Sequence, residues 1–307
     1  KRPKQFGEPI FLDSGDSGFS GISESRGRPG YPGGPGRPGV VLVHGYLGCP
    51  EQVRPLAEYL HSHGYNVYCV RLAGHGTSSS QLPHVTWADW MDSVMHGYAV
   101  MKQHCDRVVV AGFSLGGMLA LLAAARLGQD IDGAICINTP VRLRDKRMPL
   151  VPAMVRFSRV MRRVGLRKGY AFWRHTTESP GINYDHNYLV GVSEVRRAMA
   201  AGRREIRRIE CPVQVVQAED DPLIAPSSGK TLLAELTCDE KVLTELSFNR
   251  HMIIRGPGSE LVFAKMLSFL GRNRTQHAAS ENRIAPEPGA IRFRVDSLHA
   301  ESNDQSK

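Results

Sequence analysis

Val108-Val109-Val110-Ala111-Gly112-Phe113-Ser114-Leu115-Gly116 is the most informative segment of this 307-residue chain. An apolar run typical of a buried strand leads into the pattern G-x-S-x-G, and the helix-forming residues 117–125 follow. A turn this sharp strains the serine backbone and leaves no room for side chains two positions away. Glycine on both flanks meets that requirement. The segment therefore predicts a nucleophile elbow with Ser114 at its tip.

The loop after a later predicted strand, residues 212–217, supplies candidate acids. A nucleophilic serine needs a base to take its proton and an acid to orient that base, and after an elbow the acid precedes the base in the chain. Three carboxylates compete in this loop: Glu219, Asp220 and Asp221. Asp221 is the preferred acid because it begins the turn that the following proline fixes, and Asp220 is the second candidate.

His251 is the predicted base. It follows the predicted strand 241–246 and precedes a predicted helix near residues 259–270. The chain has twelve histidines, so it is the position in this order that singles out His251. His44 and His75 each follow an earlier strand beside glycines, and packing and hydrogen bonding are the roles expected of them.

The predicted strand 40–43 ends in His44-Gly45-Tyr46-Leu47-Gly48. An oxyanion hole takes one amide from the residue after the nucleophile and one from the loop after an earlier strand. Two glycines allow this loop to approach an acyl carbonyl closely. The backbone N–H groups of Tyr46 and Leu115 are therefore the predicted oxyanion donors.

Together these motifs, with Gly74-His75-Gly76 between them, resemble the bacterial carboxylesterase and monoacylglycerol lipase branch of the α/β-hydrolase superfamily. The resemblance covers about residues 39–271. It implies cleavage of short- to medium-chain acyl esters or monoglycerides through an acyl-enzyme. It further implies that Ser114 is the nucleophile, that Asp221 and His251 support it, and that Tyr46 and Leu115 supply the amides.

The alternation of predicted strands and helices indicates an α/β protein. It predicts the α/β-hydrolase fold, with one mostly parallel, doubly wound sheet and helices on both faces, over residues 39–271. About seventy residues separate the strand 132–137 from the strand at residue 212. They predict a helical cap insertion at about residues 141–210.

Both ends of the chain have a different composition. Residues 1–38 are predicted to hold an edge strand near residues 8–13 and a Gly/Pro-rich linker, because the stretch 25–39 cannot form a helix or a central strand. Residues 272–307 are polar and lack apolar periodicity, which predicts a disordered tail.

Positive charge is concentrated in the predicted insertion. Residues 141–210 hold seventeen Lys and Arg and six Asp and Glu, a net charge of +11, within a chain of net charge +9. This positive charge is consistent with a solvated helix surface that has no binding role. It is also consistent with a surface that attracts anionic lipid headgroups, acidic acyl substrates such as CoA thioesters, or another protein. No nucleic-acid motif accompanies the charge, so nucleic acid is not an expected partner. The oligomeric state is not predicted.

The six cysteines include no C-x-x-C pair, and several lie in predicted strands. They predict reduced core residues in a reducing compartment, and thus a cytoplasmic protein. No cysteine lies near a histidine at metal-ligand spacing, and neither a metal nor a cofactor is predicted.

Several functions share the predicted serine chemistry. An acyltransferase or a thioesterase would use the same residues, because nothing in the sequence says whether water or another group accepts the acyl chain. A catalytically inert binding module is a further alternative, since the fold alone proves no activity. A peptidase would also need an acidic group that binds the substrate amine.

Overall fold

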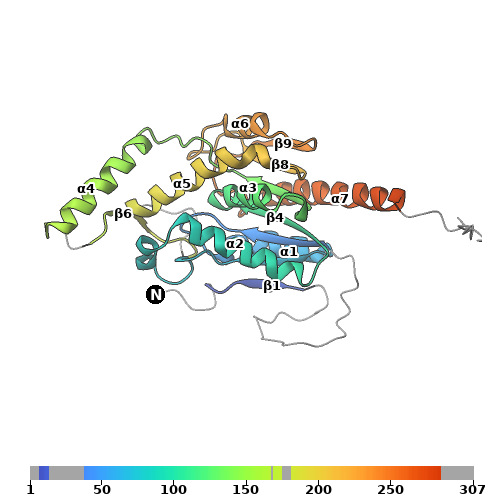
Figure 1. The fold of residues 1–307 in the computed structure, drawn as a ribbon, viewed down its shortest axis with the longest axis horizontal. Helices are drawn as coiled ribbons and strands as arrows, with labels where there is room; N and C mark the ends of the chain where they lie inside the picture. The colour runs from blue at the N-terminus through green and yellow to red at the C-terminus, as the bar shows by residue number, and fades with distance from the viewer. Residues whose placement is uncertain (1–6, 14–37, 167–168, 175–180, 285–307) are drawn as a thin grey trace, which may run out of the picture.

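The computed structural model describes residues 7–13, 38–166, 169–174 and 181–284. Its centre is a seven-stranded sheet with the order β1-β3-β2-β4-β5-β8-β9 (Figure 1). The strands are β1 (Ile10–Leu12), β2 (Pro38–Val43), β3 (Asn66–Val70), β4 (Arg107–Phe113), β5 (Gly133–Ile137), β8 (Val213–Ala218) and β9 (Lys241–Leu246). Only β1 pairs antiparallel, at one edge of this sheet. The predicted mostly parallel sheet is confirmed.

Helices cover both faces of the sheet. Those on one face are α1 (Arg54–Ser62) and α7 (Ser259–Ile284), and those on the other are α2 (Trp87–Lys102), α3 (Leu115–Leu127), α5 (Leu189–Glu205) and α6 (Ser228–Glu235). Alternate residues of β4 point to opposite faces of the sheet. Val108 and Val110 pack beneath α2 and α3, whereas Val109 packs in the layer of α1 and α7. Burial on both faces explains why this strand is an unbroken apolar run.

The insertion between β5 and β8 is not purely helical. It contains η5 (Met148–Leu150), α4 (Val151–Arg163), β6 (Phe172–Arg174), β7 (His186–Tyr188), α5 and η6 (Ile206–Arg208). The strands β6 and β7 form a separate antiparallel ribbon that the sequence did not predict, since three residues each are too short to show a period. In Figure 1, α4 lies at the end of the molecule farthest from α7, whereas α5 runs back over the sheet beside α3.

Both ends of the chain lie partly outside the described residues. β1 lies inside the predicted edge segment, whereas residues 14–37, with most of the Gly/Pro-rich stretch, fall outside the described residues. α7 continues to Ile284, so residues 272–284 of the predicted disordered tail are helical in the structure. Neither glycine nor proline occurs between Arg272 and Ile284, and a polar composition argues against burial rather than against a helix. Residues 285–307 are not among those described.

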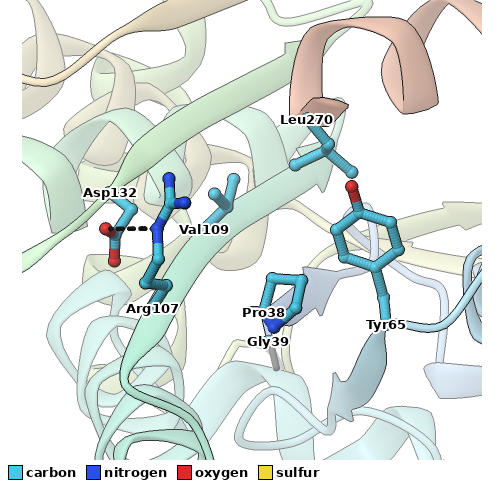
Figure 2. Close-up of a pocket in the computed structure, with 7 residues that line it drawn as sticks. All are labelled: Pro38, Gly39, Tyr65, Arg107, Val109, Asp132 and Leu270. Carbon is cyan, nitrogen blue, oxygen red and sulfur yellow. Dashed lines mark hydrogen bonds and ion pairs between the residues drawn. The ribbon is translucent and has the colours of Figure 1, made fainter. Parts of the chain in front are cut away.

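A small pocket marks the amino ends of the parallel strands (Figure 2). Pro38 and Arg107 line it where β2 and β4 begin, and Arg107 Nε lies 3.3 Å from Asp132 Oδ1. This is the opposite edge of the sheet from Ser114, which follows the last residue of β4. The pocket therefore has no part in the site described below.

The remaining short helical turns are η2 (Pro50–Gln52), η3 (Ser79–His84) and η4 (Gly128–Asp130). Within the described ranges, no helix combines the length and the apolar character needed to cross a membrane.

Candidate active site

Ser114 occupies the turn between β4 and α3, in a strained backbone conformation with φ 56° and ψ −118°. Its N–H donates to the Ile137 carbonyl at 2.8 Å, which ties the turn to β5. A Cβ on Gly112 would overlap the Gly116 carbonyl, and a Cβ on Gly116 would overlap the Val43 carbonyl. These close backbone approaches are the physical reason for glycine at both flanking positions.

His251 lies beside the serine, in the loop after β9. Its Nε2 is 2.9 Å from Ser114 Oγ, and its Nδ1 is 2.6 Å from Asp221 Oδ2. An ionised carboxylate only accepts hydrogen bonds, so Nδ1–H donates to Asp221 and Nε2 is left to accept from the serine hydroxyl. The arrangement can move a proton from Ser114 to His251.

Asp221 is the one of the three competing carboxylates that reaches the histidine. It is fully buried, whereas Glu219 and Asp220 are exposed. Its second oxygen, Oδ1, accepts the N–H groups of Leu223 at 2.8 Å and Ile224 at 3.0 Å. Two backbone amides therefore hold the carboxylate in place behind His251 and satisfy the oxygen that does not face the imidazole.

Asn138 is a site residue that the sequence analysis missed. It follows β5, is fully buried and has a φ of 42°. Its Nδ2 donates to the His251 carbonyl at 2.7 Å, and its Oδ1 accepts the Ala218 N–H at 2.7 Å. Asn138 thus joins the end of β8 to the histidine loop. The sequence signal that could have pointed to this residue is an asparagine directly after a buried strand, because asparagine adopts the left-handed backbone conformation more readily than most residues.

The predicted oxyanion donors lie in neighbouring turns. Leu115 is the first residue of α3, where a helix leaves its N–H groups without partners of its own. Tyr46 lies in a tight turn closed by the bond from Gly48 N–H to the Gly45 carbonyl, at 3.1 Å. A Cβ on Gly116 would come within 2.7 Å of the His44 carbonyl oxygen, so the start of α3 packs directly against this loop.

His44 and His75 lie beneath the loop, in the packing roles predicted for them. His44 is fully buried, and its Nδ1–H donates to the Gly45 carbonyl at 2.9 Å while its Nε2 accepts the Leu72 N–H at 3.2 Å. One ring nitrogen donates and the other accepts, which fixes the neutral tautomer. His75 bonds the Ala73 carbonyl through Nδ1 at 2.9 Å.

A mostly parallel sheet, a serine on a strand-to-helix elbow and a histidine–aspartate pair from later loops define an α/β-hydrolase. A family model described as serine aminopeptidase, S33 (Hydrolase_4), matches residues 34–257, which is well over half of the chain. The chain belongs to this family.

Relatives and solved structures of the same superfamily support the resemblance that the motifs predicted. The chain is 28% identical over 243 residues to a thermostable monoacylglycerol lipase of Bacillus sp. (strain H-257), covering 76% of this chain and 90% of the relative. It is 25% identical over 234 residues to a carboxylesterase of Bacillus subtilis (strain 168), covering 75% and 91%. A monoacylglycerol lipase structure from Paleococcus ferrophilus matches with a TM-score of 0.63 at 20% identity, covering 78% and 97%.

A lipolytic enzyme from the metagenome-derived LipS and LipT pair gives a TM-score of 0.68 at 23% identity, covering 78% of this chain and 95% of the other. At these identities the structural matches show the fold, and they confirm the α/β-hydrolase fold predicted from the sequence.

Proposed function

We propose that this protein is a serine hydrolase that cleaves carboxylic esters of short to medium acyl chains, or monoacylglycerols, through an acyl-enzyme. The observation that carries the proposal is the hydrogen-bonded row from Ser114 through His251 to Asp221 at a strained elbow. Relatives named monoacylglycerol lipase and carboxylesterase, each matched over about three quarters of this chain, support the choice of an ester bond.

In the first half of the reaction, Ser114 Oγ attacks the ester carbonyl carbon and His251 Nε2 takes the hydroxyl proton. Asp221 keeps Nδ1 protonated and stabilises the imidazolium that forms. The N–H groups of Tyr46 and Leu115 bind the oxyanion, and each such donor is worth about 10²–10³-fold in kcat. His251 then gives its proton to the leaving alcohol oxygen as the C–O bond breaks, which leaves the acyl-enzyme.

In the second half, water replaces the alcohol. His251 takes a proton from the water, the hydroxide attacks the acyl carbon, and the proton returns to Ser114 Oγ as the acid leaves. An alcohol or a thiol in place of water would make the same site an acyltransferase, and a thioester substrate would make it a thioesterase. The description of the family as serine aminopeptidases keeps a peptidase as a further alternative.

The test compares p-nitrophenyl esters from acetate to palmitate, 1-monoacylglycerols and aminoacyl p-nitroanilides on the wild-type protein. We expect turnover of the esters with an optimum at one acyl length, and anilide turnover at least about a hundredfold lower. Labelling of Ser114 by a fluorophosphonate, absent in Ser114→Ala, would exclude the inert binding module. A folded wild-type protein that turns over no ester would refute the proposal.

Variants then test the assigned roles. We expect Ser114→Ala and His251→Ala to lower kcat by about 10⁴-fold or more, and Asp221→Asn by about 10³–10⁴-fold, because the imidazole loses its tautomer. Asp220→Asn is the matched control, since that carboxylate is the exposed neighbour in the same loop, and it should stay within twofold of the wild type. Collapse of Asp220→Asn with an active Asp221→Asn would reverse the assignment.

For the insertion we propose contact with an anionic lipid surface. Apolar side chains face solvent along α4 and its ends, with Leu150 59%, Phe157 65% and Leu166 75% exposed. Exposed arginines at positions 156, 159 and 163 accompany them on the same helix. Uncovered apolar groups beside arginines are the combination that binds a headgroup layer of negative charge.

Vesicle sedimentation tests the lipid contact. We expect the protein to bind phosphatidylglycerol vesicles at least tenfold better than phosphatidylcholine vesicles, with the difference removed by 0.5 M salt. The double variant Arg156→Gln with Arg159→Gln should lose most of the preference while keeping ester hydrolysis in solution. Equal binding to both vesicle types would contradict the proposal.

The proposed cytoplasmic location rests on the cysteines. All six are buried thiols that form no disulfide. Burial raises the pKa of the Cys136 thiol to about 12 and keeps it protonated, so it acts as a small apolar core residue.

A further inference from the structure

The loop that carries Tyr46 is bound by a segment of the insertion, residues 182–184. Ile182, Asn183 and Tyr184 each make one hydrogen bond to it or to the turn that follows it. We propose that Tyr184 and Gln52 are positioning residues that hold the oxyanion loop, residues 44–48, in the geometry that catalysis needs. The inference rests on the proposed function, because it assigns the Tyr46 N–H as an oxyanion donor.

The loop needs an external support because Leu47 is strained. Its φ is 66°, in the left-handed region that a leucine rarely adopts and that costs about 1–2 kcal/mol. The Leu47 carbonyl accepts the Tyr184 N–H at 2.9 Å, and the Leu47 side chain packs in a buried cluster with Tyr184 and Leu82. Tyr184 thus holds the strained Leu47 in two ways, by a hydrogen bond to the Leu47 carbonyl and by packing against the Leu47 side chain.

Gln52 supports the loop through its side-chain amide. It is 1% exposed, and its Oε1 accepts the Gly45 N–H at 2.7 Å. Its Nε2 donates to Asn183 Oδ1 at 3.0 Å, so the same amide reaches from the loop to the insertion. A Cβ on Gly48 would lie 2.8 Å from Gln52 Oε1. Glycine at position 48 therefore leaves the space that the Gln52 amide fills.

The Tyr184 hydroxyl extends the support to a third segment. It accepts the Thr77 N–H at 2.8 Å and lies 3.4 Å from the Gly74 carbonyl oxygen. Its ring stacks on His75, with 6.4 Å between the ring centroids. Tyr184 is 6% exposed, so these bonds are shielded from water. The insertion, the oxyanion loop and the turn at residues 74–77 are joined through one side chain.

The expected kinetic effect follows from how an oxyanion hole works. A preorganised donor contributes about 10²–10³-fold to kcat, and a displacement of about 1 Å loses much of that contribution. Removal of one support loosens the loop without deleting the Tyr46 amide. We therefore expect part of the donor's effect to be lost, about tenfold in kcat, with KM within twofold of the wild type.

The kinetic test uses Gln52→Leu, which keeps the side-chain volume and removes both amide hydrogen bonds. It also uses Tyr184→Phe, which removes the hydroxyl bonds to residues 74–77 and leaves the backbone bond to Leu47 in place. Asp185→Ala is the matched control, because that residue adjoins Tyr184, is exposed and bonds His186. Affinity for a boronic acid that mimics the tetrahedral intermediate should fall about tenfold in Gln52→Leu, fall less in Tyr184→Phe, which keeps the bond to Leu47, and stay unchanged in the control. A purely stabilising role would lower the unfolding temperature and leave the affinity of the folded protein unchanged.

Hydrogen–deuterium exchange of the peptide covering residues 44–53 tests the support without any turnover. We expect exchange at least tenfold faster in Gln52→Leu than in the wild type and the Asp185→Ala control. If Gln52→Leu does not fold, Asn183→Ala breaks the same link from the insertion side. Unchanged exchange would overturn the inference even in an active esterase. Faster exchange in a protein that cleaves no ester would refute the proposed function and leave the loop support standing.

Discussion

The site residues at the carboxyl ends of β4, β5 and β8 are hydrogen-bonded, and Asn138 and Asp221 among them are fully buried, whereas α4 leaves large apolar side chains in solvent. Ser114, Asn138 and Asp221 each have partners within 3 Å, and the backbones there approach too closely for a Cβ on the flanking glycines. On α4, Phe157 is 65% exposed. The difference shows that the reacting atoms lie in a closely packed part of the chain, whereas one face of α4 is left uncovered.

The border between the closely packed part of the chain and the part with exposed apolar side chains lies within the insertion, not at either end of it. Ala198 of α5 is fully buried, and a Cβ on Gly202 would overlap the Met118 side chain of α3. α5 is therefore part of the helical layer on the sheet, and α4 with the β6–β7 ribbon forms the outer part.

Gly116→Ala should have the largest effect. The new Cβ would meet the Val43 and His44 carbonyls, which are backbone atoms that cannot move alone, so we expect a loss of about 3 kcal/mol or more in unfolding free energy. Gly165→Ala in the outer part is the comparison, because a Cβ there would have no atom within 4 Å and the only cost is that of holding an alanine at φ 75°, about 1 kcal/mol. Urea unfolding of both variants measures the contrast. Equal losses would remove the distinction between the regions.

Asn138→Ala should come next. It leaves the buried Ala218 N–H and the His251 carbonyl without their partner, which costs about 2–3 kcal/mol, and kcat should fall about 10–100-fold as His251 shifts. Asn187→Ala is the control, because the Asn187 side-chain oxygen on β7 has no hydrogen-bond partner among the described residues. Unfolding and ester kinetics on both variants measure this. If Asn187→Ala lowered the unfolding free energy and kcat as much as Asn138→Ala, the outer part would be as closely packed as the carboxyl ends of the strands.

The same contrast explains what the sequence predicted. Strands β2 and β4 are buried on both faces, so each contains a continuous apolar run that is visible without any tertiary information. β8 is buried as well, and its apolar residues alternate with Gln214 and Gln217. Ser114 could be found because its backbone strain requires glycines beside it. Asp221 could be chosen over Asp220 because the proline after it fixes a turn, although the burial that separates the two is a tertiary property.

The features that the sequence did not predict depend on contacts between distant segments. The β6–β7 ribbon pairs residues 172–174 with 186–188, and neither short strand carries a period of its own. Asn138 is one polar residue whose role exists only once β8 and the His251 loop meet it. The extension of α7 to Ile284 was missed for another reason, since apolar periodicity reports burial and a polar helix has none.

Glu194 tests the border itself. This α5 residue is 3% exposed, and its carboxylate accepts the Trp87 N–H at the start of α2 and the Arg197 guanidinium. Glu194→Ala should cost about 1–2 kcal/mol, because the first amide of α2 loses its partner. Glu205→Ala removes only a solvent-exposed pair with Arg126 and should cost a few tenths of a kcal/mol at most, about the median for such pairs. Similar denaturation midpoints for the two variants would place α5 outside the tightly packed region.

Phe157→Ser should have the smallest effect on stability. The side chain contributes little to the folded state while it faces solvent, so we expect the unfolding free energy to change by less than about 0.5 kcal/mol in dilute solution. The substitution should instead weaken binding to anionic vesicles, since it removes the most exposed aromatic group on α4. Thermal unfolding without lipid and sedimentation with vesicles separate the two effects. A loss of more than 1 kcal/mol without lipid would mean that the apolar face of α4 is covered in solution. α4 would then be as closely packed as the carboxyl ends of the strands.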